Sequence, residues 1–270
     1  MTFYSYTLGF IAFFSSVIGT LIGKLGGAEE QSVNQGLFGY NSILTGMALF
    51  LFLSGHDRWW IALAGAAFAV IPTAALTYIM RPTKIPVLTL PFIVLTWFGL
   101  LASYHLSSFK ISPALAPQSL SQWTLEIKGE TNWLNGMIDG IGQVFFIDHM
   151  LSGILVIIAL FWAGWKFGVY ALIGSFSAMI TSSFLGGENH LIFSGMYGYN
   201  AVLAIISVSI VFKENDRNGL LLGIIAACLT VPATASVMTL LMPYGLPVLT
   251  IPFVLITWIF LAARKVLPSL

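Results

Sequence analysis

"LPVLTIPF", at residues 246–253, places two prolines and a threonine inside an apolar stretch, and "IPVLTLPF", at residues 85–92, does the same. The two threonines, Thr89 and Thr250, are 161 positions apart. Proline interrupts a helix because it has no backbone N–H and its ring displaces the carbonyl of the residue four positions earlier. The two stretches therefore predict two interrupted helices of the same construction.

The similarity between the two stretches extends over the chain. "GLFGYNSIL" at 36–44 matches "GMYGYNAVL" at 195–203, and "IPTA" at 71–74 corresponds to "VPAT" at 231–234. The three pairs of segments occur in the same order, at separations of 159, 160 and 161 residues. A repeat of this kind indicates an internal duplication.

The composition is that of an integral membrane protein. Hydrophobic residues make up 58% of the chain and charged residues only 8%, whereas roughly 25% of the residues in a soluble domain are charged. The net charge of +1 gives no electrostatic basis for a nucleic-acid partner. Cys228 is the single cysteine, which excludes an internal disulfide and a cysteine metal cluster.

Apolar runs long enough to cross a membrane predict an all-α, polytopic protein. We expect nine spans, near residues 3–22, 37–53, 59–80, 85–105, 150–164, 167–185, 192–212, 219–242 and 246–263. The segment "GMIDGIGQVFFID" at 136–148 is too short and interrupted to cross, and predicts a re-entrant half-helix. The chain then divides into a first repeat at 1–110, a polar connector at 111–132 and a second repeat at 133–270.

An odd number of crossings, five, separates corresponding helices, so the two repeats of about five spans each are expected to have inverted topology. Nothing in the first half corresponds to the re-entrant segment or to the span at 150–164. The first repeat is therefore incomplete by roughly 30–40 residues. We expect either a mis-assigned start codon or a natural truncation, and in-frame coding sequence upstream of Met1 that resembles residues 133–165 would decide for the former.

Basic residues between the spans predict the orientation in the membrane. The excess of lysine and arginine on one side predicts a cytoplasmic C-terminus. That side would carry Lys24, Arg81, Lys84, Lys166, Lys213, Arg217, Arg264 and Lys265, and the other side Arg58, Lys110 and Lys128.

The doubled motif is expected to present hydrogen-bond acceptors. The second proline of each copy would leave the carbonyls of Val87 and Val248 without helical partners, and such carbonyls must face protein, water or a permeant. Thr89 and Thr250 each add a hydroxyl. An ion would require charge or a full carbonyl cage, so these acceptors favour a small neutral molecule rich in N–H groups.

The "GYN" segments are expected to add apolar walls. Tyr40 and Tyr199 contribute flat rings, and Leu44 and Leu203 lie one helical turn further along the same face. Aromatic and aliphatic walls with a few acceptors suit a planar, uncharged amide.

These motifs together resemble the urea transporter family. The resemblance rests on the duplicated L-P-x-x-T-x-P-F motif, on "GYN" followed by leucine in both halves, and on "GIGQVFF" followed by "LSG". It covers essentially the whole chain from Thr2 onward. The chain departs from the family pattern at Ile85 in place of leucine, in having tyrosine where relatives often have phenylalanine, and in lacking the first-half "GQVFF" segment.

The resemblance implies two inverted halves, a pore within each subunit and a homotrimer. It implies rings at 40 and 199 that sandwich the plane of urea, and a narrow centre lined by the threonines and leucines. The implied pore positions are Thr89, Thr250, Tyr40, Tyr199, Leu44, Leu203, Gln143, Val144 and Phe146, the last three from the re-entrant segment.

The expected function is passive facilitated diffusion of urea across the inner or plasma membrane, with urea and the lipid bilayer as partners and with no cofactor or metal. A channel for ammonium, ammonia or a short-chain amide is an alternative, as is a truncated chain that packs but does not conduct. The sequence contains neither HExxH nor GxSxG, and the expected spans contain no pair of carboxylates at helical spacing, so an enzyme is not expected.

Overall fold

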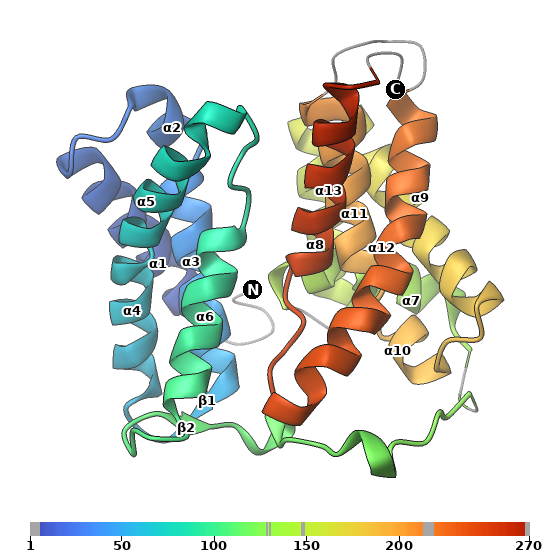
Figure 1. Ribbon diagram of the computed structural model, residues 1–270, viewed down its shortest axis with the longest axis horizontal. Helices are drawn as coiled ribbons and strands as arrows, with labels where there is room; N and C mark the ends of the chain where they lie inside the picture. The colour runs from blue at the N-terminus through green and yellow to red at the C-terminus, as the bar shows by residue number, and fades with distance from the viewer. Residues whose placement is uncertain (1–5, 128, 130, 147–148, 213–218, 268–270) are drawn as a thin grey trace. The chain divides into compact units, whose positions relative to one another are not determined.

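The computed structural model describes residues 6–127, 129, 131–146, 149–212 and 219–267 (Figure 1). Helices make up most of this part of the chain. The strands described are β1 (Leu53–Ser54) and β2 (Lys110–Ile111), which form one short antiparallel pair. The structure thus confirms the predicted all-α membrane fold.

The chain forms two compact units. The first comprises Met1–Leu120 together with Leu241–Leu249, and the second comprises Ser121–Leu240 together with Thr250–Leu270. The boundary between the units therefore passes through the second copy of the proline motif, between Leu249 and Thr250.

Helix α3 is the centre of the first unit. It packs against α1, α4 and α6 (Figure 1). Most of its side chains are buried. A Cβ atom built on Gly19 of α1 would lie 2.2 Å from the Ser42 hydroxyl of α3, so the two helices approach closely because Gly19 has no side chain. The helices of this unit are α1 (Tyr6–Leu25), α2 (Glu30–Asn34), α3 (Leu37–Phe52), α4 (Arg58–Phe68), α5 (Val70–Met80), η1 (Arg81–Thr83), α6 (Leu90–Ala102), η2 (Pro113–Leu115) and η6 (Met242–Tyr244).

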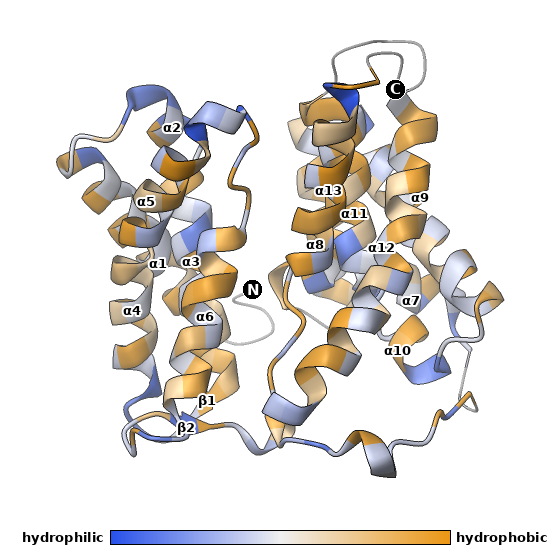
Figure 2. Ribbon diagram, in the orientation of Figure 1, coloured by the Kyte–Doolittle hydropathy of each residue, from blue (hydrophilic) through white to orange (hydrophobic). Residues whose placement is uncertain are grey.

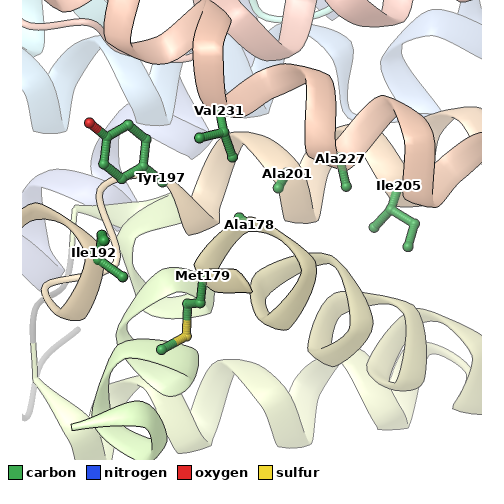
Figure 3. Close-up of a cluster of buried hydrophobic side chains, with 8 residues drawn as sticks. All are labelled: Ala178, Met179, Ile192, Tyr197, Ala201, Ile205, Ala227 and Val231. Atoms are coloured by element: carbon green, nitrogen blue, oxygen red, sulfur yellow. The ribbon is translucent and has the colours of Figure 1, made fainter. Parts of the chain in front are cut away.

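Helix α11 has the same place in the second unit and packs against α7, α9 and α13. Figure 3 shows a buried apolar cluster to which α9, α10, α11 and α12 all contribute. The helices of this unit are η3 (Leu120–Gln122), α7 (Trp133–Gly142), η4 (Gln143–Phe145), α8 (Met150–Ala163), α9 (Trp165–Phe184), α10 (Asn189–Phe193), α11 (Gly198–Ile206), the π-helical turn η5 (Ser207–Val211), α12 (Gly219–Leu241) and α13 (Ile251–Arg264).

Four helical stretches of the described chain are long and apolar enough to cross a membrane: Tyr6–Leu25, Arg58–Thr83, Trp165–Phe184 and Gly219–Tyr244. Helix α7 with η4 forms a pair with α8 that is bent by 74°. The predicted re-entrant segment ends at residues 147–148, which lie outside the described residues. Figure 2 shows that apolar residues line most of each long helix and that hydrophilic residues gather mainly at helix ends and in connections.

The duplication is visible in the helix boundaries. Shifted by 159 residues, α1 coincides with α9 and α2 with α10, and shifted by 161 residues, α4 and α5 together coincide with α12. Left-handed backbone conformations recur at matching positions in the two halves. The pairs and their φ angles are Gly27 and Gly186 (79° and 74°), Gly36 and Gly195 (78° and 80°), Lys84 and Gly245 (56° and 57°), and Leu88 and Leu249 (52° and 52°).

Candidate functional site

Each proline motif forms a turn followed by a helix. In the first copy, residues 85–89 are not helical, Thr89 is the N-cap of α6, and Pro91 lies in the first helical turn. In the second copy, Thr250 is the N-cap of α13. Proline is well tolerated in a first turn, where the backbone N–H groups have no helical partner. The expectation of a proline in a helix interior is therefore wrong: the interruption precedes the helix, and the proline helps to begin it.

The turn also changes the interpretation of the Val87 carbonyl. Its oxygen accepts a hydrogen bond from the Leu90 amide, at an N···O distance of 3.2 Å. The expectation that this carbonyl lacks a partner is wrong, because the chain turns before the helix starts. A carbonyl oxygen has a second lone pair, so Val87 stays a predicted pore position, as does Val248, and both residues are buried.

Leu88 and Leu249 adopt the unusual backbone conformation of the two turns. Both have a φ of 52°, a left-handed conformation that costs a residue with a Cβ atom roughly 1–3 kcal/mol. The Leu88 carbonyl accepts two hydrogen bonds, from the Tyr40 hydroxyl (O···O 3.0 Å) and from the Asn41 side-chain amide (N···O 3.3 Å). Helix α3 thus supports the strained turn from the side.

Two buried asparagines connect the "GYN" segments to the turns, and the sequence interpretation missed both. The Asn41 Oδ1 atom accepts a hydrogen bond from the Phe92 amide (3.2 Å), and the Asn200 Oδ1 atom accepts one from the Phe253 amide (3.1 Å). Both side chains are fully buried. The available signal was the recurrence of the same polar residue at the same position of two apolar repeats.

In the first unit, the structure brings Tyr40 to the turn that contains Thr89, through the bond to Leu88. Thr89 and Leu44 are buried, with 8% and 7% of their surfaces exposed, and Tyr40 is half-buried. Leu44 follows Tyr40 one helical turn later on α3, and α3 packs against α6. The turn and the "GYN" face therefore belong to one neighbourhood.

The segment that carries Val248 also belongs to the first unit. Trp97 of α6 donates its indole N–H to the Pro247 carbonyl (2.9 Å), and the Tyr104 hydroxyl donates to the Tyr244 carbonyl (3.1 Å). The Gln118 amide donates to the Met242 carbonyl (3.2 Å). These bonds explain why Leu241–Leu249 groups with the first unit although it is distant in the sequence.

In the second unit, Tyr199 and Thr250 are buried and Leu203 is half-buried. Val144 packs against a buried cluster of Ile141, Ala171 and Val202. The other two positions from the re-entrant segment lie beside it: Gln143 donates to the Ser194 carbonyl at 3.4 Å, and Phe146 has a left-handed φ of 57°.

The two turns offer neutral acceptors and apolar walls. Residues 85–92 and 246–253 contain no charged side chain. Acceptors of this kind can bind the N–H groups of a neutral molecule, whereas an ion would require charge or a full carbonyl cage. This is the chemistry that the motif predicts.

Comparison with known proteins identifies the family of the chain. The family model described as "Urea transporter" matches residues 1–265. Urea transporter 1 from Ovis aries and from Capra hircus are each 27% identical to the chain over 260 residues, which cover 94% of this chain and 68% of each relative. Urea transporter 1 from Rattus norvegicus is 26% identical over the same length. Because the family model matches almost the whole chain, this protein belongs to the urea transporter family.

Proposed function

We propose that the protein lets urea cross the membrane by passive, channel-like facilitated diffusion. The observation that carries this proposal is the recurrence of one turn in both units. Each turn has a leucine at a φ of 52°, then a threonine at the N-cap of an apolar helix. Family membership and the apolar helices support a membrane transporter and not an enzyme.

The chemistry of the turns suits urea. Urea is flat and uncharged, and it carries N–H groups on both sides of one carbonyl. We propose that the hydroxyls of Thr89 and Thr250 and the second lone pairs of the Val87 and Val248 carbonyls accept these N–H groups. Each such exchange replaces a hydrogen bond to water, so that urea can leave water at a modest net cost.

Apolar side chains are proposed to form the walls of the path. A flat molecule moves between aromatic faces without losing contact area, and aliphatic side chains exclude the water that would otherwise accompany it. The proposed wall positions are Tyr40, Tyr199, Leu44, Leu203, Val144 and Phe146, with Gln143 as a polar member.

The same proposal includes the arrangement of the chain in the membrane. We propose two inverted repeats, at 1–110 and 133–270, joined by the connector at 111–132, with a cytoplasmic C-terminus. The excess of basic residues on one side supports this orientation. We further propose a homotrimer in the inner or plasma membrane with a pore in each subunit, as the family resemblance implies.

Swelling of proteoliposomes tests the function. Vesicles that contain the purified protein are mixed with urea, formamide, acetamide or ammonia, and the rate of swelling is compared with that of empty vesicles. We expect urea to produce the largest acceleration. Equal acceleration by all the amides would support a general amide channel, acceleration by ammonia alone an ammonia channel, and no acceleration a protein that does not conduct.

A further inference from the structure

The N-termini of α6 and α13 require a cap. The first backbone N–H groups of a helix have no helical partner, and the side chain of a threonine at the N-cap commonly accepts one of them, at the second or third position of the helix. In both motifs the second position is a proline, which has no N–H. The amides at the third position belong to Phe92 and Phe253.

Thr89 and Thr250 do not supply this cap, since neither N-cap side chain makes a capping hydrogen bond. A side chain from a different helix replaces them. Asn41 of α3 accepts the Phe92 amide at 3.2 Å, and Asn200 of α11 accepts the Phe253 amide at 3.1 Å.

Asn41 also holds the backbone on the other side of Thr89. Its side-chain amide donates to the Leu88 carbonyl (3.3 Å) and to the Leu37 carbonyl (3.0 Å). One fully buried side chain therefore bonds the residue before the threonine and the amide three residues after it. Such a pair of bonds restrains the conformation of the N-cap residue.

We propose that Asn41 and Asn200 are positioning residues of the urea path. Each asparagine performs the capping that the motif threonine would otherwise perform, and so keeps the threonine side chain in the orientation in which it meets urea. Without the asparagine, the amide of Phe92 or Phe253 loses its acceptor, and the N-cap threonine carries the hydroxyl that commonly accepts a bond from this position. This inference rests on the proposed function, since it assigns a task to the threonines.

The first experiment is a double-mutant cycle in the swelling assay. Asn41→Leu and Thr89→Val are each expected to lower urea flux about tenfold, and the double variant is expected to be no slower than either, because both remove the same interaction. Ser42→Ala is the matched control. Ser42 is the next residue on α3, is fully buried, and donates to the Ala66 carbonyl (2.7 Å) away from the turn. Any loss of urea flux caused by Ser42→Ala should therefore multiply with the loss caused by Thr89→Val when the two substitutions are combined.

A second variant guards against loss of folding. Asn41→Asp has the same shape and keeps an oxygen at the position that accepts the Phe92 amide. It is expected to retain more urea flux than Asn41→Leu at equal protein in the vesicles. If Asn41→Asp and Asn41→Leu lose flux equally while both elute as intact protein, the capping oxygen is not the important feature and the proposal is wrong.

The second experiment does not depend on transport. Hydrogen exchange of the purified protein, localised by fragmentation to the Phe92 amide, is expected to be at least about tenfold faster in Asn41→Leu than in the wild type. Ser42→Ala should leave this amide protected. Unchanged exchange in Asn41→Leu would overturn the cap itself.

The two experiments separate the possible failures. Faster exchange combined with multiplicative flux losses would mean that Asn41 only stabilises the fold, which overturns the positioning role. A wild-type protein that passes no urea would overturn the proposed function and with it the positioning role, whereas the exchange measurement would still decide whether the asparagine caps the helix.

Discussion

Two pairs of threonines recur in the two halves, and their hydroxyls lie in different surroundings. Thr89 and Thr250 begin helices, whereas Thr96 and Thr257 lie seven residues further on, inside the same helices. The hydroxyls of the second pair are buried and have no hydrogen-bond partner in the described structure. The chain thus contains its own comparison between a threonine that we propose to act on urea and one that we do not assign to the path.

Thr250→Val is expected to lower urea flux about tenfold, because a hydrogen bond of roughly 1.4 kcal/mol is lost where urea crosses the barrier. The size of the side chain is nearly unchanged, and thermal unfolding of the same variant measures any loss of stability separately from flux. The measurement is the rate of vesicle swelling in a urea gradient, compared at equal amounts of protein per vesicle. Thr257→Val is the control, and equal flux in the two variants would remove Thr250 from the path.

Thr96→Val and Thr257→Val are each expected to stabilise the protein by about 1 kcal/mol, because a buried hydroxyl without a partner is replaced by a methyl group. Thermal unfolding in detergent measures this effect, with wild type and Thr250→Val run beside them. A lower midpoint for both variants would show that these hydroxyls have partners in solution.

At the scale of helices, the two halves differ around the start of α3 and of α11. Gly36 and Gly195 occupy matching positions with φ angles of 78° and 80°. A Cβ atom at Gly195 would lie 2.3 Å from the Gly140 amide nitrogen of α7, whereas a Cβ atom at Gly36 would meet nothing within 4 Å. The backbone of α7 therefore packs directly against Gly195. The Ser175 hydroxyl of α9 also donates a hydrogen bond to the Met137 carbonyl of α7 (2.9 Å).

Gly195→Ala and Gly36→Ala form a matched pair for this contact. Both substitutions carry the left-handed cost of roughly 1–2 kcal/mol. Only Gly195→Ala also forces α7 away, which is expected to add about 1–3 kcal/mol. Thermal unfolding should show the larger loss for Gly195→Ala, and equal losses would mean that α7 does not depend on this approach.

The whole molecule has a net charge of only +1, and the residues proposed to line its path include no charged side chain. The proposed passive mechanism therefore requires no gradient other than that of urea, since coupling to ions needs buried charge or dedicated ligands. Histidine is the side chain that ordinarily titrates near neutral pH, and the chain has no histidine in residues 85–92 or 246–253.

Urea flux through the intact protein is expected to be unchanged between about pH 6 and pH 8. Histidine is the side chain that would titrate in this range, and the two proline motifs contain none. Swelling rates in vesicles with equal pH on both sides measure this. A second series with a sodium or proton gradient at constant urea should give the same rates. A dependence on either gradient would contradict passive diffusion.

The sequence was sufficient to predict the class of the fold and the duplication. A membrane helix can be predicted from a long apolar run, because this signal lies within one segment and does not depend on contacts with other helices. Each predicted span overlaps a described helix, but 85–105 and 246–263 begin as turns. The span 192–212 begins at the end of α10 and turns before α11, and the span 59–80 is divided at Ala69. The repeat was equally visible, because related residues recur at nearly constant separation.

Hydrophobicity and spacing are properties of the chain alone, and they were enough to predict an all-α membrane protein with two copies of one motif. The fold was needed to locate the prolines within their helices, to reveal the left-handed turns at Leu88 and Leu249, and to show the capping by Asn41 and Asn200. The physical reason is that a strained backbone and an orphan amide are stabilised by side chains from another helix, about 50 residues away in the sequence, and local patterns do not record that partner.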